Sequence, residues 1–194
     1  MSTKGRNHVR IIGGKWKNTR INLSGSGLVR PTPVRAREVL FNWLNFRIAS
    51  WRVLDVFAGS GCLSFEALSR GAKTATLLDN NHSVCTKLRR SCSDLQLSSD
   101  QATVIKTDAY RWLENQDSSW DLIFLDPPFR QVDWYPKYLR VLKDRVSNEG
   151  FIYVESSKRE EINLDGFRVF RMKDVGEVRI ALVTPHQPIA CRKH

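Results

Sequence analysis

The first 37 residues of this 194-residue chain contain no acidic side chain. Nine Lys and Arg residues lie between Met1 and Arg37, and Glu38 is the first carboxylate. The formal net charge is +11, so subtracting these nine leaves +2 for the other 157 residues. Such a concentrated basic block favours contact with phosphate groups, because each Lys or Arg near a phosphate releases a condensed counterion. The alternative is a solvated basic tail without a partner.

Metal-binding and membrane signals are also missing. The four cysteines form no C-x-x-C pair, and the four histidines do not cluster with them at zinc-ligand spacing, so we expect no metal. No apolar run approaches the roughly 20 residues of a membrane span, and the N-terminal residues lack the apolar core of a secretory signal. We therefore expect a cytoplasmic protein without a membrane partner.

The chain also lacks internal repeats and low-complexity tracts, and its length suits one core with an appendage. Two β-prone runs around Gly13 and Gly14 predict a small hairpin or meander over residues 8–23. The stretch SGSGLVRPTP then breaks the pattern with turn formers and prolines. We expect a basic N-terminal extension at residues 1–29, a main domain at 30–185 and a tail at 186–194.

Helical and strand-like patterns alternate through the main domain. Apolar residues at helical spacing predict a helix over residues 34–46, with basic residues at its entry. From residue 51, runs that are apolar on both faces alternate with helical segments, which is typical of a parallel sheet in a doubly wound α/β fold. Residues 167–184 read as two strands around an Asp174–Gly176 turn, which predicts an antiparallel C-terminal hairpin.

A glycine loop follows the first predicted strand of this domain. In DVFAGSG, Gly59 and Gly61 would let the backbone approach a ligand at the start of the next helix. The dinucleotide-binding fingerprint requires Gly or Ala where Ser64 stands, and the carboxylate of Asp55 would repel a pyrophosphate. The loop therefore favours a cofactor that carries a cation.

S-adenosylmethionine has an ammonium and a sulfonium but no phosphate, and it fits this loop. Asp79 ends the second strand, where its carboxylate can accept both ribose hydroxyls, and Asp108 follows the third strand near the expected adenine. Each acid alone could instead be a helix N-cap or a loop carboxylate. The predicted cofactor-binding residues are Asp55, Phe57, Ala58, Gly59, Ser60, Gly61, Asp79, Asn80, Asp108 and Ala109.

The tetrapeptide DPPF follows the apolar run LIFL. Transfer of a methyl group to an exocyclic amine requires acceptors for the NH2 group, and Asp126 and the Pro127 carbonyl can supply two. Pro127 and Pro128 would stiffen the backbone, and Phe129 would stack on the base. Asp126, Pro127, Pro128 and Phe129 are therefore the predicted catalytic residues, and the alternative is a rigid loop after a strand.

These motifs, with GGKWKNTRI and RPTPVRAREVLFNWL upstream, resemble the bacterial small-subunit (16S) ribosomal RNA guanine-N2 methyltransferases, the RsmD-type enzymes. The resemblance spans about residues 8–185. It implies a Rossmann-like class I S-adenosylmethionine-dependent fold and methylation of one guanosine N2 amine in an assembled or assembling subunit. We expect a monomer whose basic N-terminal region grips the RNA through Arg10, Lys15, Lys17, Arg20, Arg30, Thr32, Arg35 and Arg37.

Three other functions share parts of this pattern. An N6-adenine methyltransferase uses the same tetrapeptide type, but such enzymes generally need a target-recognition region, and no insertion of that kind occurs here. A protein-glutamine methyltransferase has Asn where Asp126 stands. A non-catalytic RNA-binding assembly factor could share the scaffold, although the intact set of cofactor-binding acids argues against it.

Overall fold

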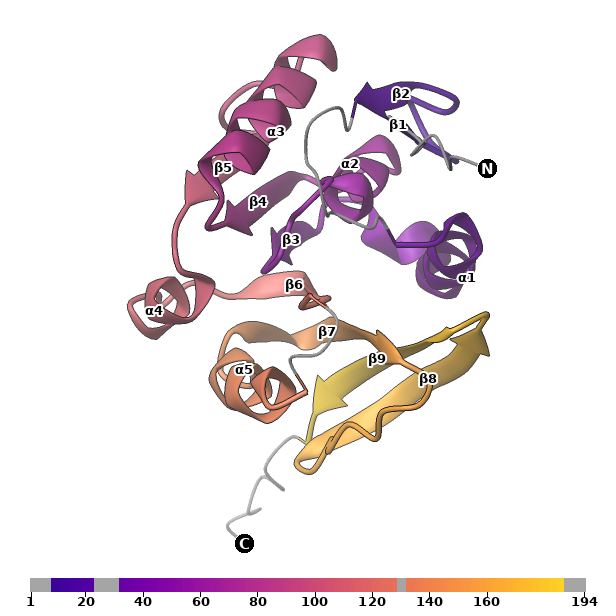
Figure 1. Cartoon of the computed structure of the whole chain (residues 1–194), viewed down its shortest axis with the longest axis vertical. Coiled ribbons are helices and arrows are strands. Elements are labelled where there is room, and N and C mark those ends of the chain that lie inside the picture. The colour runs from indigo at the N-terminus through magenta and orange to yellow at the C-terminus, as the bar shows by residue number, and fades with distance from the viewer. Residues whose placement is uncertain (1–7, 23–31, 129–131, 187–194) are drawn as a thin grey trace, which may run out of the picture.

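The computed structural model describes residues 8–22, 32–128 and 132–186. Most of its strands form one seven-stranded sheet in the order β5-β4-β3-β6-β7-β9-β8, and β1 and β2 form a separate two-stranded sheet (Figure 1). The elements are β1 (His8–Arg10), β2 (Arg20–Asn22), α1 (Val34–Leu44), η1 (Asn45–Ile48), β3 (Arg52–Asp55), α2 (Cys62–Ser69), β4 (Thr74–Asp79), α3 (His82–Asp94), β5 (Ala102–Lys106), α4 (Ala109–Glu114), β6 (Trp120–Leu125), α5 (Trp134–Leu142), β7 (Val146–Ser157), β8 (Phe167–Val175) and β9 (Val178–Pro185).

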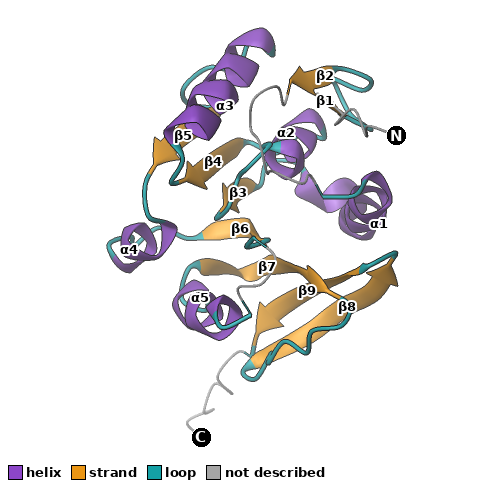
Figure 2. Ribbon diagram, viewed as in Figure 1, coloured by secondary structure: helices purple, strands orange, loops and turns teal. Residues whose placement is uncertain are grey.

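The large sheet is parallel from β5 to β7 and ends in an antiparallel hairpin (Figure 2). β9 lies between β7 and β8 and runs against both of them. The predicted fold class, a mostly parallel Rossmann-like sheet with an antiparallel C-terminal hairpin, is confirmed. Because β3 to β7 run the same way, their carboxyl ends meet at one edge of the sheet, where ligands bind in such folds.

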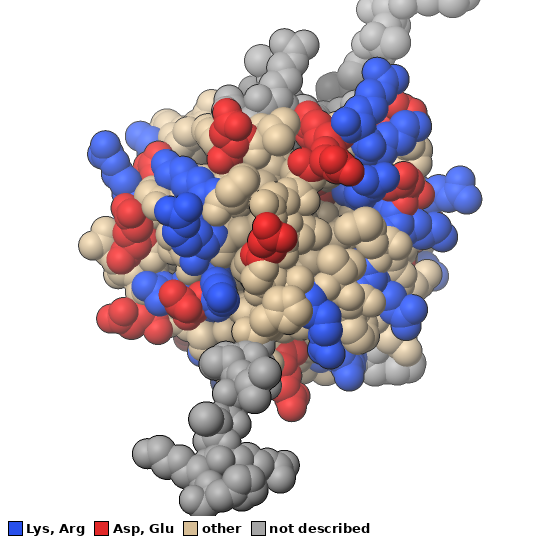
Figure 3. All heavy atoms as spheres, turned by 90° about the horizontal axis from the view of Figure 1, so that it is seen from below, with Lys and Arg blue, Asp and Glu red and all other residues tan. Residues whose placement is uncertain are grey.

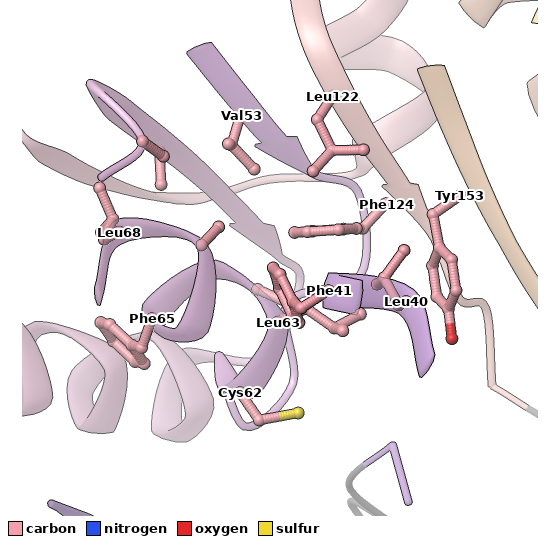
Figure 4. Packing of buried hydrophobic residues seen from close by; sticks show 14 of the residues in the cluster. Leu40, Phe41, Val53, Cys62, Leu63, Phe65, Leu68, Leu122, Phe124 and Tyr153 are labelled. Atoms are coloured by element: carbon pink, nitrogen blue, oxygen red, sulfur yellow. The ribbon is translucent and has the colours of Figure 1, made fainter. Parts of the chain in front are cut away.

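Apolar side chains alternate between two layers on either side of the sheet. Val53 and Leu122 belong to a cluster with α1, α2 and α3, whereas Leu54 and Ile123 belong to a cluster with α4 and α5. Figure 4 shows part of the first layer, in which α1 and α2 pack on the central strands. Helices therefore cover both faces of the central strands. Within the described ranges, no helix has the length and apolarity needed to cross a membrane.

The N-terminal hairpin packs on the first of these layers. β1 and β2 pair antiparallel, which confirms the hairpin predicted over residues 8–23. Val9, Ile11 and Ile21 are buried in the same cluster as α1 and α2. The hairpin is therefore part of the core, although the division of the chain at residues 29 and 185 stays a prediction.

The turn of the hairpin is bound to the end of α2. The Lys15 backbone N–H donates to the Ser69 carbonyl (2.7 Å), and the Trp16 N–H donates to the Ser69 hydroxyl (2.9 Å). That hydroxyl donates in turn to the Gly13 carbonyl (2.6 Å). Gly14 adopts a positive φ of 74°, and a Cβ there would overlap the Ser69 carbonyl oxygen. Only glycine satisfies both constraints.

A buried carboxylate joins the hairpin to both helices. Glu66 of α2 is fully buried and accepts from the Ile12 backbone N–H (2.8 Å) and from Arg70 Nε (2.7 Å). The Arg37 guanidinium of α1 lies 3.6 Å from Glu66 and donates to the Arg10 carbonyl (3.0 Å). Arg37 is only 1% exposed, so its predicted contact with RNA is wrong: this side chain pairs with Glu66 inside the protein.

Replacement of Gly14 tests how tightly the hairpin is held. Gly14→Ala should lower the free energy of unfolding by about 2 kcal/mol more than Gly176→Ala, because only the first substitution adds a steric overlap to the strain of a positive φ. Gly176 is the matched control, with a φ of 65° and nothing within 4 Å of an added Cβ. Urea unfolding of both variants measures the difference, and equal losses would show that the turn is free to move.

Candidate active site

Predicted site residues follow each of the central strands at the carboxyl edge of the sheet. Asp55 ends β3, Asp79 ends β4, Asp108 follows β5 and Asp126 follows β6. Asp55 is buried, Asp79 and Asp126 are half-buried, and Asp108 is exposed. The topology thus places the four acids along one edge, with Asp55 and Asp126 on neighbouring strands.

The glycine loop is folded tightly between β3 and α2. The Gly59 N–H donates to Asp79 Oδ2 (3.1 Å), and the Gly61 N–H donates to the Ala58 carbonyl (2.7 Å). Gly61 has a φ of 71° and precedes the first residue of α2. A Cβ at Gly61 would lie 2.7 Å from Leu88 Cδ2. The loop therefore brings its backbone close to the end of β4, and the buried Ser60 hydroxyl accepts from the Cys62 N–H (3.3 Å).

Asp55 is a buried acid beneath this loop. It is 2% exposed, and the Ser64 hydroxyl donates to its carboxylate (2.8 Å). Burial raises the pKa of Asp55 from 3.8 to about 7, the bond from Ser64 opposes this rise, and the charge of Asp79 adds to it. A cation beside the loop would stabilise the ionised form. This acid therefore fits the ammonium and sulfonium of S-adenosylmethionine better than a phosphate.

The two further cofactor acids have local roles in the structure. Asp79 accepts from the backbone N–H groups of Gly59 (3.1 Å) and Asn81 (2.8 Å), so it braces the glycine loop. Asp108 caps α4 by accepting from the Arg111 N–H (2.9 Å). Both carboxylates stay accessible enough for a ligand, and their predicted contacts with ribose and adenine remain predictions. The predicted cofactor-binding residues next to these acids differ in exposure: Asn80, after Asp79, is exposed, and Ala109, after Asp108, is buried.

An aromatic cluster lies under the loop on the α5 face of the sheet. The Phe57 ring stacks on Trp134 at a centroid distance of 5.5 Å and meets the edge of Tyr138 at 5.0 Å. Tyr138 also packs edge-on against Tyr110 at 5.6 Å. Phe57 was predicted to bind cofactor, and in the structure its half-buried ring also anchors the first residues of the loop. Its role toward a cofactor stays a prediction.

Asp126 has an unexpected partner. The Thr32 hydroxyl donates to Asp126 Oδ2 (3.2 Å). Thr32 is 4% exposed, so its predicted contact with RNA is wrong as the protein stands: its side chain faces the predicted catalytic acid. Pro127 is buried and Pro128 is exposed, while Phe129 and its predicted stacking role lie outside the described residues. Burial raises the pKa of Asp126, the charges of Glu155 and Asp55 raise it further, and the bond from Thr32 opposes them.

Sequence reasoning missed Glu155 and the two tyrosines that bind it. Glu155 of β7 is 1% exposed, and the buried Tyr153 hydroxyl donates to its Oε2 (2.7 Å). The Tyr135 hydroxyl donates to the Glu155 backbone carbonyl (2.6 Å). The available signal was a single carboxylate within the apolar run FIYVES, at the end of a strand predicted to be buried.

Five of the predicted RNA-contacting side chains are exposed, namely Arg10, Lys15, Lys17, Arg20 and Arg35. Arg30 lies outside the described residues. On another face of the molecule, seen from below in Figure 3, acidic and basic side chains are interspersed. The described part of the hairpin has basic side chains and no acid. Among the described residues, no group of three or more His, Cys, Asp or Glu side chains could hold a metal ion.

Comparison with known proteins shows similarity over most of the chain. Residues 9–184 match the family described as "Conserved hypothetical protein 95". The chain is 38% identical over 154 residues to "Ribosomal RNA small subunit methyltransferase D" of Escherichia coli K12, covering 78% of this chain and 76% of that protein. The protein of the same name from Haemophilus influenzae is 35% identical over 182 residues. This alignment covers 91% of this chain and 94% of that protein. The solved structure of yhhF from Escherichia coli aligns with a TM-score of 0.81 at 34% identity, covering 93% and 99% of the two chains.

Replacement of Asp55 by Asn should remove a pH dependence of stability in the cofactor-free protein. Between pH 4 and 7 the folded protein holds a proton on Asp55 that the unfolded chain has released, because its folded pKa is raised from 3.8 to about 7. This group therefore makes the parent less stable as pH rises through that window. Relative to Asp55→Asn, the parent should lose on the order of 2 kcal/mol between pH 5 and 7.5.

Urea unfolding of both proteins at the two pH values measures this difference. Asp100→Asn, which removes an exposed carboxylate, is the control and should follow the parent. A parent and an Asp55→Asn variant whose stabilities change in parallel with pH would contradict the assignment.

Proposed function

We propose, from the premise that the chain belongs to the "Conserved hypothetical protein 95" family, that it transfers a methyl group from S-adenosylmethionine to ribosomal RNA of the small subunit. The relatives named "Ribosomal RNA small subunit methyltransferase D" support this substrate class. The finer proposal is that the acceptor is the exocyclic N2 amine of a guanosine, within an assembled or assembling subunit. This finer part is supported by the site and by the motif resemblance.

One observation carries the proposal: Asp126 and Asp55, the acids predicted to hold the amine and to face the cationic cofactor, lie at the ends of neighbouring strands. In the register of β3 with β6, Asp55 pairs with Phe124, so Asp126 follows two residues beyond that pair. The glycine loop leaves β3 at the same edge. A methyl donor held at Asp55 and Asp79 would therefore be adjacent to an amine held at Asp126.

The residues of the chain would share the work as follows. S-adenosylmethionine supplies an electrophilic methyl group when bound. Asp126, oriented by Thr32, accepts a hydrogen bond from the amine, and the Pro127 carbonyl accepts the second. Asp79 and the glycine loop orient the cofactor, and Asp55 balances its positive charge. Catalysis then depends mainly on positioning, because the base amine is a weak nucleophile.

The exposed basic side chains of the hairpin would hold the RNA backbone. Arg10, Lys15, Lys17 and Arg20 project from a structure fixed to α2 through Ser69. Contacts between these charges and phosphates do not depend on the RNA sequence. They would therefore raise the affinity for RNA more than they would select a particular base. Removing residues 1–22 would not test this idea cleanly, because Val9, Ile11 and Ile21 belong to the core.

The protein should label small subunits that lack the modification when it is incubated with S-adenosylmethionine bearing a labelled methyl group. Mass spectrometry of the nucleosides should find N2-methylguanosine, and N6-methyladenosine would favour the adenine alternative.

Asp126→Ala should retain cofactor binding by calorimetry and lose at least about 100-fold in turnover, because it loses the amine acceptor. No labelling by the parent, despite measurable cofactor binding, would favour a non-catalytic assembly factor.

Charge removal on the hairpin should weaken RNA binding and reduce its dependence on salt. The variant Lys15→Gln, Lys17→Gln, Arg20→Gln should lower the slope of log K against log salt by about 2, since each lost phosphate contact removes about 0.7 to 0.9. Cofactor affinity should be unchanged. The matched control replaces Arg111, Arg140 and Lys143, exposed residues in or next to α4 and α5, by Gln. Equal slopes for both triple variants would assign the hairpin charges to a solvated surface.

A further inference from the structure

Glu155 is a buried acid with no role in the mechanism above. It lies near the end of β7, is 1% exposed, and follows the buried run Phe151–Val154. An ionised carboxylate in such surroundings is costly unless hydrogen bonds stabilise it. Two tyrosines contact this residue, Tyr153 at its carboxylate and Tyr135 at its backbone carbonyl. We therefore looked for a function of this buried acid at the carboxyl edge of the sheet.

The strand register places Glu155 beside Asp126. β6 and β7 are parallel neighbours whose last pair is Leu125 with Val154, so the next residue of each chain segment is Asp126 and Glu155. The preceding pair, Phe124 with Tyr153, has its rings 6.0 Å apart on the α1 side (Figure 4). Because side chains alternate along a strand, Glu155 returns to the side of Tyr153. The Tyr153 hydroxyl bond to Glu155 (2.7 Å) confirms this placement.

Asp126 faces the same side. Its carboxylate accepts from Thr32, which precedes α1, and α1 packs on that face of the sheet. The buried Glu155 and the half-buried Asp126 therefore lie on the same side of the sheet at adjacent strand ends.

We propose that Glu155 is a positioning residue for the methyl-transfer reaction: its carboxylate, held by Tyr153, lies beside Asp126 and makes Asp126 a better acceptor for the proton that the methylated amine must lose. This inference rests on the proposed function. Glu155 acts through Asp126 and need not touch the substrate.

The reaction requires such an acceptor. The nitrogen lone pair forms the new N–C bond, the carbon–sulfur bond breaks with its electrons left on sulfur, and the positive charge moves to nitrogen. One N–H proton then passes to the Asp126 carboxylate. A general base works best when its pKa is near the operating pH, and an ordinary aspartate, with a pKa near 3.9, is well below it. Burial contributes most to the raised pKa of Asp126, and the negative charge of Glu155 beside it raises this pKa further.

Other groups also act on the protonation of Asp126 or on its neighbours. Asp55 on β3 adds negative charge, and Thr32 stabilises the ionised form. The charged or titratable groups that face the edge of the sheet around Asp126 from the packed elements are Arg37 of α1, Asp55 of β3, Cys62 of α2, Tyr135 of α5, and Tyr153 and Glu155 of β7. The charge of Glu155 raises the pKa of Asp126 more than the charge of Asp55 does. Removal of the Glu155 charge should therefore lower this pKa more.

The direct test follows the Asp126 carboxyl by carbon-13 NMR in the cofactor-free full-length protein, with Asp126→Asn to assign the signal. In Glu155→Gln the titration midpoint of Asp126 should fall by about one pH unit or more. Glu149→Gln, the same substitution at an exposed residue of β7, should leave the midpoint unchanged. If Glu155→Gln does not fold, Tyr153→Phe keeps the charge but removes the hydrogen bond. The Glu155 carboxylate is then no longer held beside Asp126, and the midpoint of Asp126 should fall by a smaller amount.

The pH profile of single-turnover methylation gives the second readout. In Glu155→Gln the acid limb should move to lower pH and the plateau should fall by about tenfold. An Asp126 midpoint and acid limb that stay at the parent values would overturn the role of Glu155, even if the variant were slower at every pH, since uniform loss indicates structural damage alone. A parent that binds cofactor but methylates no RNA would instead overturn the proposed function, and with it this role.

Discussion

The buried carboxylate of Glu66 is the contact on which the arrangement of this protein depends. It receives the Ile12 N–H from the hairpin, Arg70 from the end of α2, and the charge of Arg37 from α1. Loss of any one partner would leave charge or a polar group unpaired inside the protein, which typically costs about 3–5 kcal/mol for a buried ion pair. Hairpin, α1 and α2 are therefore held as one unit.

That unit fixes where the basic surface lies relative to the cofactor loop. α2 begins directly after Gly61 and ends at Ser69, so a helix of eight residues, about 12 Å long, separates the glycine loop from the hairpin turn. The exposed lysines of the turn are consequently held at a fixed distance from the glycine loop. Their position does not depend on a flexible linker, as it would in a solvated tail.

The basic side chains of the hairpin and the acids of the candidate site lie in different environments. The positive side chains of the hairpin are exposed, where salt screens them and phosphates can reach them. Asp55 and Glu155 are buried at the sheet edge beside the half-buried Asp126, where interactions between charges are stronger than in water. A chain with a net charge of +11 can thus present an acidic site to a cationic cofactor.

Sequence patterns were sufficient wherever the signal is local. Apolar runs with Gly59 and Gly61 predicted the sheet, the loop and the helix after it, because strand burial and positive φ each demand particular residue types. They failed for Arg37 and Thr32, which lie within the basic N-terminal segment but are paired with acids supplied much later in the chain. Glu155 was missed for the same reason, since its proximity to Asp126 follows from strand register.

The contacts of Arg37 and Thr32 also connect the hairpin proposed to bind RNA with the acid proposed to hold the amine. Arg37, in the first turns of α1, is part of the Glu66 cluster that holds the hairpin, and Thr32, just before α1, is bonded to Asp126. The start of α1 therefore touches both the Glu66 cluster that supports the hairpin and the predicted catalytic acid Asp126. A closely packed helix moves as a body, so a shift of the hairpin relative to the sheet would carry Thr32 with it. The contacts that orient Asp126 and those that hold the hairpin therefore meet at the start of α1, so the proposed RNA-binding surface and the proposed amine acceptor are joined by one packed element.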